Sequence, residues 1–190
     1  MMNRPPPLGE TKHEMKAVTL LQDGTEKIVG FASWIICVGR GGSEEEKERL
    51  GTKEGWLQGE KEKEGMKEKS ETEEGYGDPK IRRDVLGGIE EKLARLTGGK
   101  DYVKLDPLIV DPGYQRRGIG AMLFEDGLKV ADNAALQVVL GGSVQGVNLY
   151  KKYGCVEMDS LKTNLWDYEG GEGLGVITHA ILHRPARRSV

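Results

Sequence analysis

A strand, a turn rich in glycine and arginine, and a helix follow one another over residues 102–131, and this order of elements constrains the fold more than any other part of the chain. The apolar run 105–110 leads into Asp-Pro-Gly at 111–113, where a strand ends. Gln-Arg-Arg-Gly-Ile-Gly at 115–120 then begins an amphipathic run. Free backbone N–H groups, a helix N-terminus and two cations together bind a phosphate or pyrophosphate. Glycines at 118 and 120 let such a ligand approach the backbone.

A second strand is expected directly after this helix. Residues 136–140 are apolar apart from Gln137, as is typical of an interior strand. A strand, a helix and a strand in this order require a right-handed parallel crossover. Pro107 lies inside the first strand and cannot donate to a sheet ladder, so we expect a bulge or poor pairing there.

The remaining elements predict antiparallel pairing at both ends of the sheet. Asp-Gly at 23–24 separates two strand-like runs and indicates a hairpin. Apolar residues spaced by threes and fours predict a helix over 81–96, and a short helix is expected at 146–153. The predicted strands are 16–21, 27–38, 102–110, 136–140, 156–165 and 176–183. The expected fold class is therefore α/β (α+β), with a mixed sheet flanked by helices.

The domain organisation follows from composition. A chain of 190 residues is long enough for one domain with a core, which we place at 15–190. Residues 1–14 are expected to be disordered. Residues from about 40 to 80 are rich in glutamate, lysine and glycine and poor in apolar side chains, which predicts a charged low-complexity insertion.

Composition also excludes several classes of protein. A net charge of −3 argues against a general nucleic-acid binder. Cys37 and Cys155 are too few for a disulfide scaffold, and two reduced thiols fit a cytoplasmic or nuclear protein. His179 and His183 lie in a predicted strand and form no metal motif, so we expect no metal. No apolar run reaches the roughly 20 residues that a membrane span needs, so no membrane partner is expected.

Two motifs carry a family resemblance. The P-loop motif is absent, and Leu123 stands where the dinucleotide fingerprint needs its third glycine. Residues 115–120 resemble the Gln/Arg-x-x-Gly-x-Gly/Ala motif of the GCN5-related N-acetyltransferases (GNAT), and 149–154 is similar to their Leu-Tyr-x-x-x-Gly-Phe motif. The resemblance extends over 102–183, and more loosely over 15–38. It suggests a small fungal-type member with a shortened N-terminus.

The resemblance implies a centrally splayed GNAT-like sheet and acetyl-CoA as the cosubstrate. In that family the first strand of the crossover pairs with the pantetheine arm, and the glycine turn holds the pyrophosphate. Ser143 stands where many members carry an asparagine that bonds the pantetheine. The implied cofactor-binding residues are Leu108, Ile109, Val110, Gln115, Arg116, Arg117, Gly118, Ile119, Gly120, Ala121, Ser143 and Tyr150.

The implied reaction is direct transfer of the acetyl group to a primary amine of a small molecule. Tyr150 would act as the general acid that protonates the leaving thiolate. The glutamate that often serves as base has no counterpart, and Asp106 acting through water is a weak substitute. Lys152 suits a CoA phosphate and a solvated position equally well. The alternatives are a protein or peptide acceptor and a catalytically impaired CoA-binding module, as a monomer or homodimer.

Overall fold

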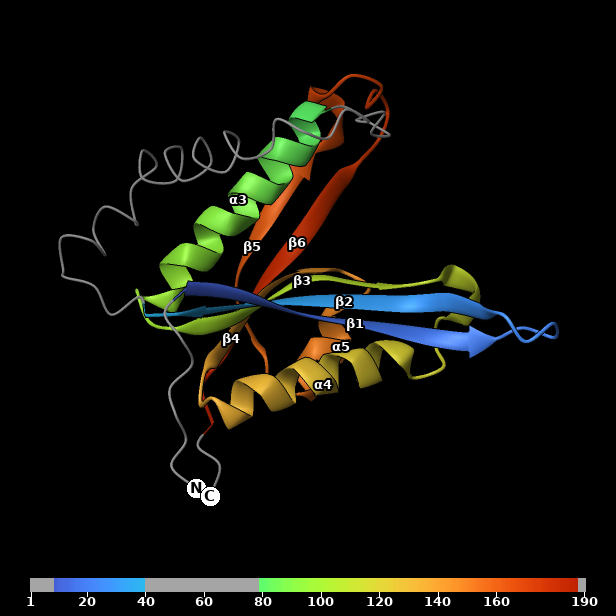
Figure 1. Ribbon diagram of the computed structural model, residues 1–190. Helices are drawn as coiled ribbons and strands as arrows, with labels where there is room; N and C mark the ends of the chain where they lie inside the picture. Colours follow the sequence, from blue (N-terminus) through green and yellow to red (C-terminus); the bar gives the residue numbers. More distant parts are fainter. Residues whose placement is uncertain (1–8, 40–78, 188–190) are drawn as a thin grey trace.

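A mixed six-stranded sheet forms the centre of the computed structural model, which describes residues 9–39 and 79–187 (Figure 1). The outer pairs are antiparallel and the central β3–β4 pair is parallel, as the sequence predicted. Along the sheet the strands are β1 (Gly9–Leu20), β2 (Glu26–Val38), β3 (Tyr102–Val110), β4 (Gln137–Ser143), β6 (Val176–Arg184) and β5 (Val156–Asn164).

The helices cover opposite faces of this sheet. Helix α3 (Pro79–Thr97) lies along β5 and β6, whereas α4 (Ile119–Asn133) and α5 (Val147–Lys152) lie on the other face (Figure 1). Within residues 9–39 and 79–187 no helix is long and apolar enough to cross a membrane. Most of the predicted charged insertion falls outside the described residues.

Strand β1 corrects the expected disorder of residues 1–14, because it begins at Gly9. Its partner β2 has 13 residues and pairs with β1 from Gly9↔Val38 onward, so residues 9–14 gain a complete ladder. His13 Nε2 also lies 3.1 Å from Asp126 Oδ2 on α4. Residues 10–14 are mostly charged and lack the apolar pattern that predicts a strand. Their strand conformation depends on pairing with β2.

Two hydrophobic cores hold the helices to the sheet. The larger lies under α4 and α5, where the rings of Trp34 and Phe124 are 5.4 Å apart. A Cβ at Gly127 would come within 1.9 Å of Trp34, so α4 lies against the sheet only because that residue is glycine. The smaller core lies under α3 and contains Cys37, Leu93, Tyr102, Val139 and Ile181.

The sheet opens between β3 and β4, and this opening positions the functional site. Residues 106 and 107 both oppose Ser33 of β2, so the bulge predicted at Pro107 is confirmed. The parallel pairing extends only over residues 102–104 and 137–139. Beyond Lys104 the two strands diverge, and Figure 1 shows the sheet as two arms, β1–β3 and β5–β6.

Candidate functional site

A cavity of about 500 Å³ lies where β3 and β4 diverge, bounded by the starts of α4 and α5. Ten of the twelve predicted cofactor-binding residues line it, while Ile109 and Arg117 do not. These ten are Leu108, Val110, Gln115, Arg116, Gly118, Ile119, Gly120, Ala121, Ser143 and Tyr150. The motifs at 115–120 and 149–154, distant in sequence, therefore meet at one hollow.

The turn after β3 is held by its own hydrogen bonds. Asp111 Oδ1 accepts from the Gly113 N–H at 2.8 Å, and the Asp111 N–H donates to Val29 O at 2.9 Å. Lys27 Nζ lies 3.1 Å from Asp111 Oδ2, and this bond holds the pKa of the Asp111 carboxyl below its usual range. The turn is thus a preformed support for the helix N-terminus that follows.

Helix α4 begins without a side-chain cap. Gly118 is its N-cap residue, with φ of 85°, and the helical ladder starts with the Met122 N–H donating to Gly118 O at 3.0 Å. The N–H groups of residues 119–121 therefore have no acceptor within the helix. They lie at the positive end of the helix dipole in a cavity wall, which is the arrangement that binds an anion.

The two glycines of the turn act differently. Gly118 needs its left-handed conformation, and a Cβ there would meet nothing within 4 Å. A Cβ at Gly120 would lie in ordinary contact, 3.5 to 3.7 Å from Leu149, Leu108 and Val110. Backbone conformation therefore favours glycine at 118, whereas at 120 the absence of a side chain leaves space in the cavity.

The two arginines of the motif occupy different positions. Arg116, with φ of 62°, lines the cavity. Arg117 lies 5.1 Å from the Tyr114 ring centre and donates to Gly113 O at 3.2 Å, so it supports the turn. The side chain of Ile109 is 59% exposed, outside the cavity lining.

Tyr150 is buried where α5 meets the cavity. Its ring lies 4.9 Å from that of Phe124, and a Cβ at Gly142 or Gly146 would come within about 3.1 Å of it. Burial raises the pKa of Tyr150 to about 12, because the phenolate loses solvation. The side chain therefore stays protonated at neutral pH and is able to donate a proton into the cavity.

Six further cavity-lining residues were not predicted as cofactor-binding: Tyr114, Gln145, Gly146, Asn148, Leu149 and Lys152. Residues 145, 148 or 149, and 152 recur at helical spacing, so the short helix itself was the signal that they share a face. Lys152 lies at the cavity, the position that the sequence left open between two alternatives.

The face of the opening toward α3 is charged. Lys104 is buried, with Nζ 2.5 Å from Glu90 Oε1 and 3.4 Å from Asp106 Oδ2. Burial lowers the pKa of Lys104, but the two carboxylates outweigh burial and leave it raised. Asp106, the weak candidate base, is thus a partner of Lys104. Across residues 9–39 and 79–187, no three metal-binding side chains cluster.

One family model matches the middle of the chain. Residues 89–165 match the family model described as an acetyltransferase (GNAT) domain, and this range contains most of the cavity lining. No curated protein sequence matches the chain.

Two solved structures share the fold, and a third has lower similarity. Arylalkylamine N-acetyltransferase 2 from Aedes aegypti has 17% identity and a TM-score of 0.51, covering 90% of this chain and 72% of its own. An agmatine N-acetyltransferase has 15% identity and a TM-score of 0.50, covering 83% and 70%. Chaetomium thermophilum Naa20, solved with a bisubstrate analogue, has 15% identity and a TM-score of 0.47, covering 90% of this chain and 65% of its own. This chain thus spans just under two thirds of the Naa20 chain.

Proposed function

We propose that the chain is an acetyl-CoA-dependent N-acetyltransferase whose acceptor is a primary amine of a small molecule, because residues 89–165 match the GNAT acetyltransferase domain. One observation carries the proposal. One cavity is bordered by the parts of β3 and β4 that do not pair with each other, by the uncapped start of α4 and by the buried phenol of Tyr150.

Different parts of the cavity suit different parts of the cosubstrate. The N–H groups of residues 119–121 and the Arg116 side chain provide donors and positive charge for a pyrophosphate. Residues 108–110 of β3 have no β4 partner, so their open edge suits an extended amide-containing arm, as in strand addition. Ser143 at the end of β4 adds a hydroxyl from the opposite wall.

The chemistry is a direct transfer. The amine nitrogen forms a bond to the acetyl carbon, and the carbon–sulfur bond breaks. Tyr150 donates its proton to the departing thiolate and is restored by a proton from the amine nitrogen. With a pKa of about 12, the phenol remains protonated until a strong base forms beside it.

The acceptor enters this proposal as an ammonium ion. Asp106 is about half exposed at the opening and provides a counter-charge of the right sign. The N-terminal amine of a peptide carries the same positive charge as a small amine, so Asp106 suits both acceptors. A module that only binds CoA would bind no amine at all. The acceptor class therefore needs an experiment.

The test measures thiol release from acetyl-CoA with phenethylamine, agmatine and a short peptide with a free N-terminus, beside calorimetry with CoA. We expect CoA binding and turnover on a small amine. Turnover on the peptide alone would assign a protein acceptor. Binding without turnover on any amine would identify a CoA-binding module, and absence of binding would contradict the whole proposal.

A further inference from the structure

We infer that His179 on β6 is the general base of this reaction and accepts a proton from the acceptor amine, an inference that rests on the proposed function. The proposal supplies the base that the sequence did not identify. It depends on the position of His179 in the sheet and on the surroundings of its ring.

The strand register places His179 beside the cavity. His179 is the direct partner of Ser143 in the antiparallel β4–β6 pair, and Ser143 lines the cavity. Side chains of directly opposed residues have Cβ atoms about 5 Å apart. His179 is therefore a neighbour of the position where β4 borders the opening.

The register also shows which face His179 occupies. Lys104 is the parallel partner of Val139, and Val139 is the partner of His183, so these residues share one face. Alternation along β6 places His179 on this face too, with Lys104 and Asp106. A Cβ at Gly141, on the same face, would come within 2.7 Å of Ile89, which identifies this face as the one under α3.

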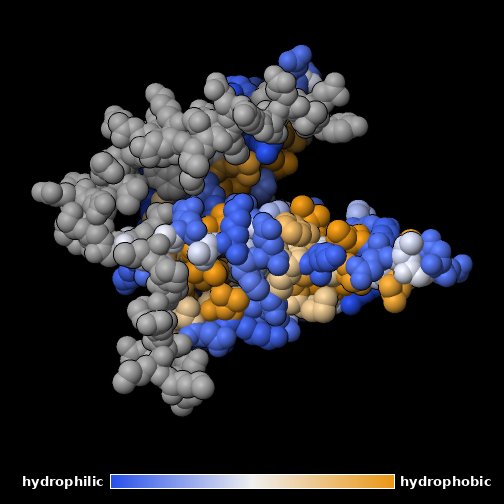
Figure 2. Space-filling view, in the orientation of Figure 1, coloured by the Kyte–Doolittle hydropathy of each residue, from blue (hydrophilic) through white to orange (hydrophobic). Residues whose placement is uncertain are grey.

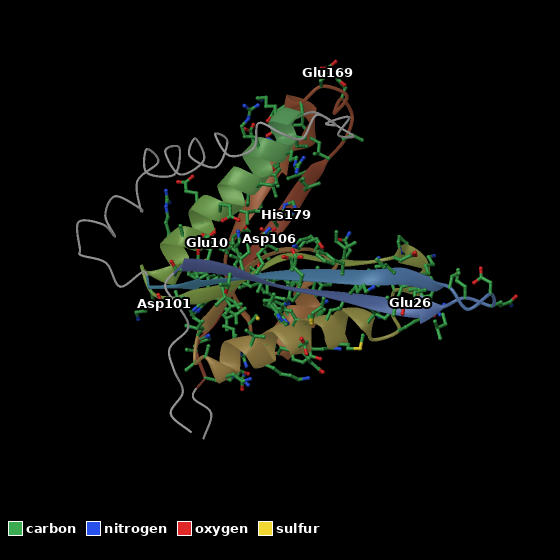
Figure 3. The ribbon with its side chains drawn as sticks, viewed as in Figure 1. Glu10, Glu26, Asp101, Asp106, Glu169 and His179 are labelled. Atoms are coloured by element: carbon green, nitrogen blue, oxygen red, sulfur yellow. The ribbon has the colours of Figure 1, made fainter. Side chains whose placement is uncertain are left out.

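This face is opposite the one where Tyr150 lies. Tyr150 packs against Gly142, whose side of β4 faces α4 and α5. A thioester held in the opening between β3 and β4 thus has Tyr150 on one side of the sheet and His179 on the other. Figure 2 shows a hollow between the two arms, and Figure 3 shows His179 and Asp106 close together near its inner end.

The surroundings of the ring keep His179 neutral. In the described part of the chain, His179 Nδ1 is one of two buried side-chain nitrogen or oxygen atoms that have no hydrogen-bond partner; the other is Trp34 Nε1. Protonation at Nε2 would place a positive charge on a ring whose buried Nδ1–H has no acceptor, which is costly. Burial accordingly lowers the pKa of His179 below 6.5.

The neighbouring charged groups pair with one another and do not reverse the lowered pKa of His179. On β5 the direct partner of His179 is the apolar Leu161. Asp159, the partner of Ile181, pairs with Lys92 of α3 at 2.5 Å. On the side of β3, Glu90 pairs with Lys104, and Asp106 also contacts that lysine. Because Nδ1 is buried, we assign Nε2 as the atom that takes a proton from the ammonium group held near Asp106.

The proton balance is complete with two groups. Nε2 takes one proton from the ammonium and releases it to solvent after turnover. The free amine then attacks the thioester, and its second proton restores Tyr150 after Tyr150 has protonated the thiolate. The products are the N-acetyl amide, the CoA thiol and one proton.

The test compares H179Q with H183Q for the amine of the panel above that is acetylated fastest. His183 is a matched control, because it lies on the same strand and face, also has a pKa lowered by burial, and is bonded through Nε2 to Gln137 at 2.9 Å. We expect H179Q to lower kcat/KM for the amine at pH 7 by about 100-fold or more. H183Q should remain within about threefold of wild type, a margin that corresponds to well under 1 kcal/mol.

The pH profile separates a base from a structural residue. Wild-type kcat/KM should fall below an apparent pKa under 6.5 and level off above it. With H179Q the rate should instead rise about tenfold per pH unit from pH 7 to 9, because only the free amine then reacts. CoA affinity should be the same in both variants.

Three results would overturn the inference. H179Q with wild-type turnover and an unchanged acid limb would contradict it while leaving the proposed function intact. An equal loss of turnover and of CoA affinity in H179Q would assign His179 a structural role. CoA binding by the wild type without turnover on any amine would contradict the proposed function first, and this inference with it.

Discussion

Tyr102, Val103 and Lys104, at the start of β3, are buried and pair with β2 on one side and β4 on the other. Beyond Lys104 the same strand pairs with β2 alone. Residues 106–110 range from half-buried to exposed. The Pro107 bulge lies where this change occurs. One strand therefore joins the two arms of the sheet at its start and borders the cavity at its end. This difference predicts that the two ends respond differently to substitution.

The largest expected effect is at the turn beyond the open end. Gly118→Asp should abolish CoA binding in calorimetry, because a carboxylate would stand where the pyrophosphate meets the helix amides. Its left-handed backbone also costs the variant about 1–2 kcal/mol in unfolding free energy.

Gly24→Asp is the matched control for that change. Gly24 has φ of 81° and open space around a Cβ, but it lies in the β1–β2 turn. It should lose the same stability and keep CoA affinity. Unaltered CoA binding by Gly118→Asp would place the pyrophosphate elsewhere.

The next effect concerns the phenol. Tyr150→Phe should lower kcat by about 100-fold while leaving CoA affinity nearly unchanged, because only proton donation is removed. Tyr153→Phe removes a hydroxyl from the same helix end, one that donates to Glu125 Oε1 at 2.6 Å. Stopped-flow thiol release should show no comparable loss for that variant. Equal rates for wild type and Tyr150→Phe would exclude the acid role.

The environment of Tyr150 also predicts a titration. Its pKa is about 12 in the folded protein and near 10 in the unfolded chain. The folded state therefore loses stability as pH rises from 10 towards 12, because only the unfolded chain ionises there. A difference in tyrosinate absorbance between wild type and Tyr150→Phe should be absent at pH 10.5. A signal of one full tyrosinate at that pH would show that the phenol is solvated.

The smallest effects separate the two ends of β3 by stability. Val103 is fully buried at the paired end, so Val103→Ala should cost roughly 2 kcal/mol in urea unfolding. Ile109 is 59% exposed at the open end, and Ile109→Ala should change stability by less than about 0.5 kcal/mol. Because the proposed contact there is through the backbone, Ile109→Ala should also retain CoA affinity. Equal losses of stability would contradict the contrast between the ends.

Much of this fold was predictable because local chemistry determines the elements. The strand at 102–110 has the predicted bounds, and the helix after the turn, which the sequence predicts from Gly118, begins at Ile119. Pro107 forecast the bulge, since the missing N–H acts through the residue itself. The start of β1 was missed, because charged residues form a strand there only through pairing with β2.

The candidate site divides in the same way. The glycine turn and Tyr150 belong to short motifs, so spacing was enough to single them out. The position of Arg117 against the Tyr114 ring depends on the path of the turn, which spacing does not determine. His179 was visible only as a histidine in a strand. Its importance comes from the pairing with Ser143, a contact between residues 36 positions apart, and from its place under α3.

Hydrogen–deuterium exchange with and without CoA tests the central claim most directly, because it measures the backbone amides themselves. We predict that CoA slows exchange at residues 108–110 and 118–121 and leaves residues 102–104 unchanged, since residues 102–104 already lie between two paired strands, β2 and β4. Protection spread evenly along β3, or none at 118–121 at saturating CoA, would contradict the assignment of the open end of β3 and the start of α4 as the cofactor site.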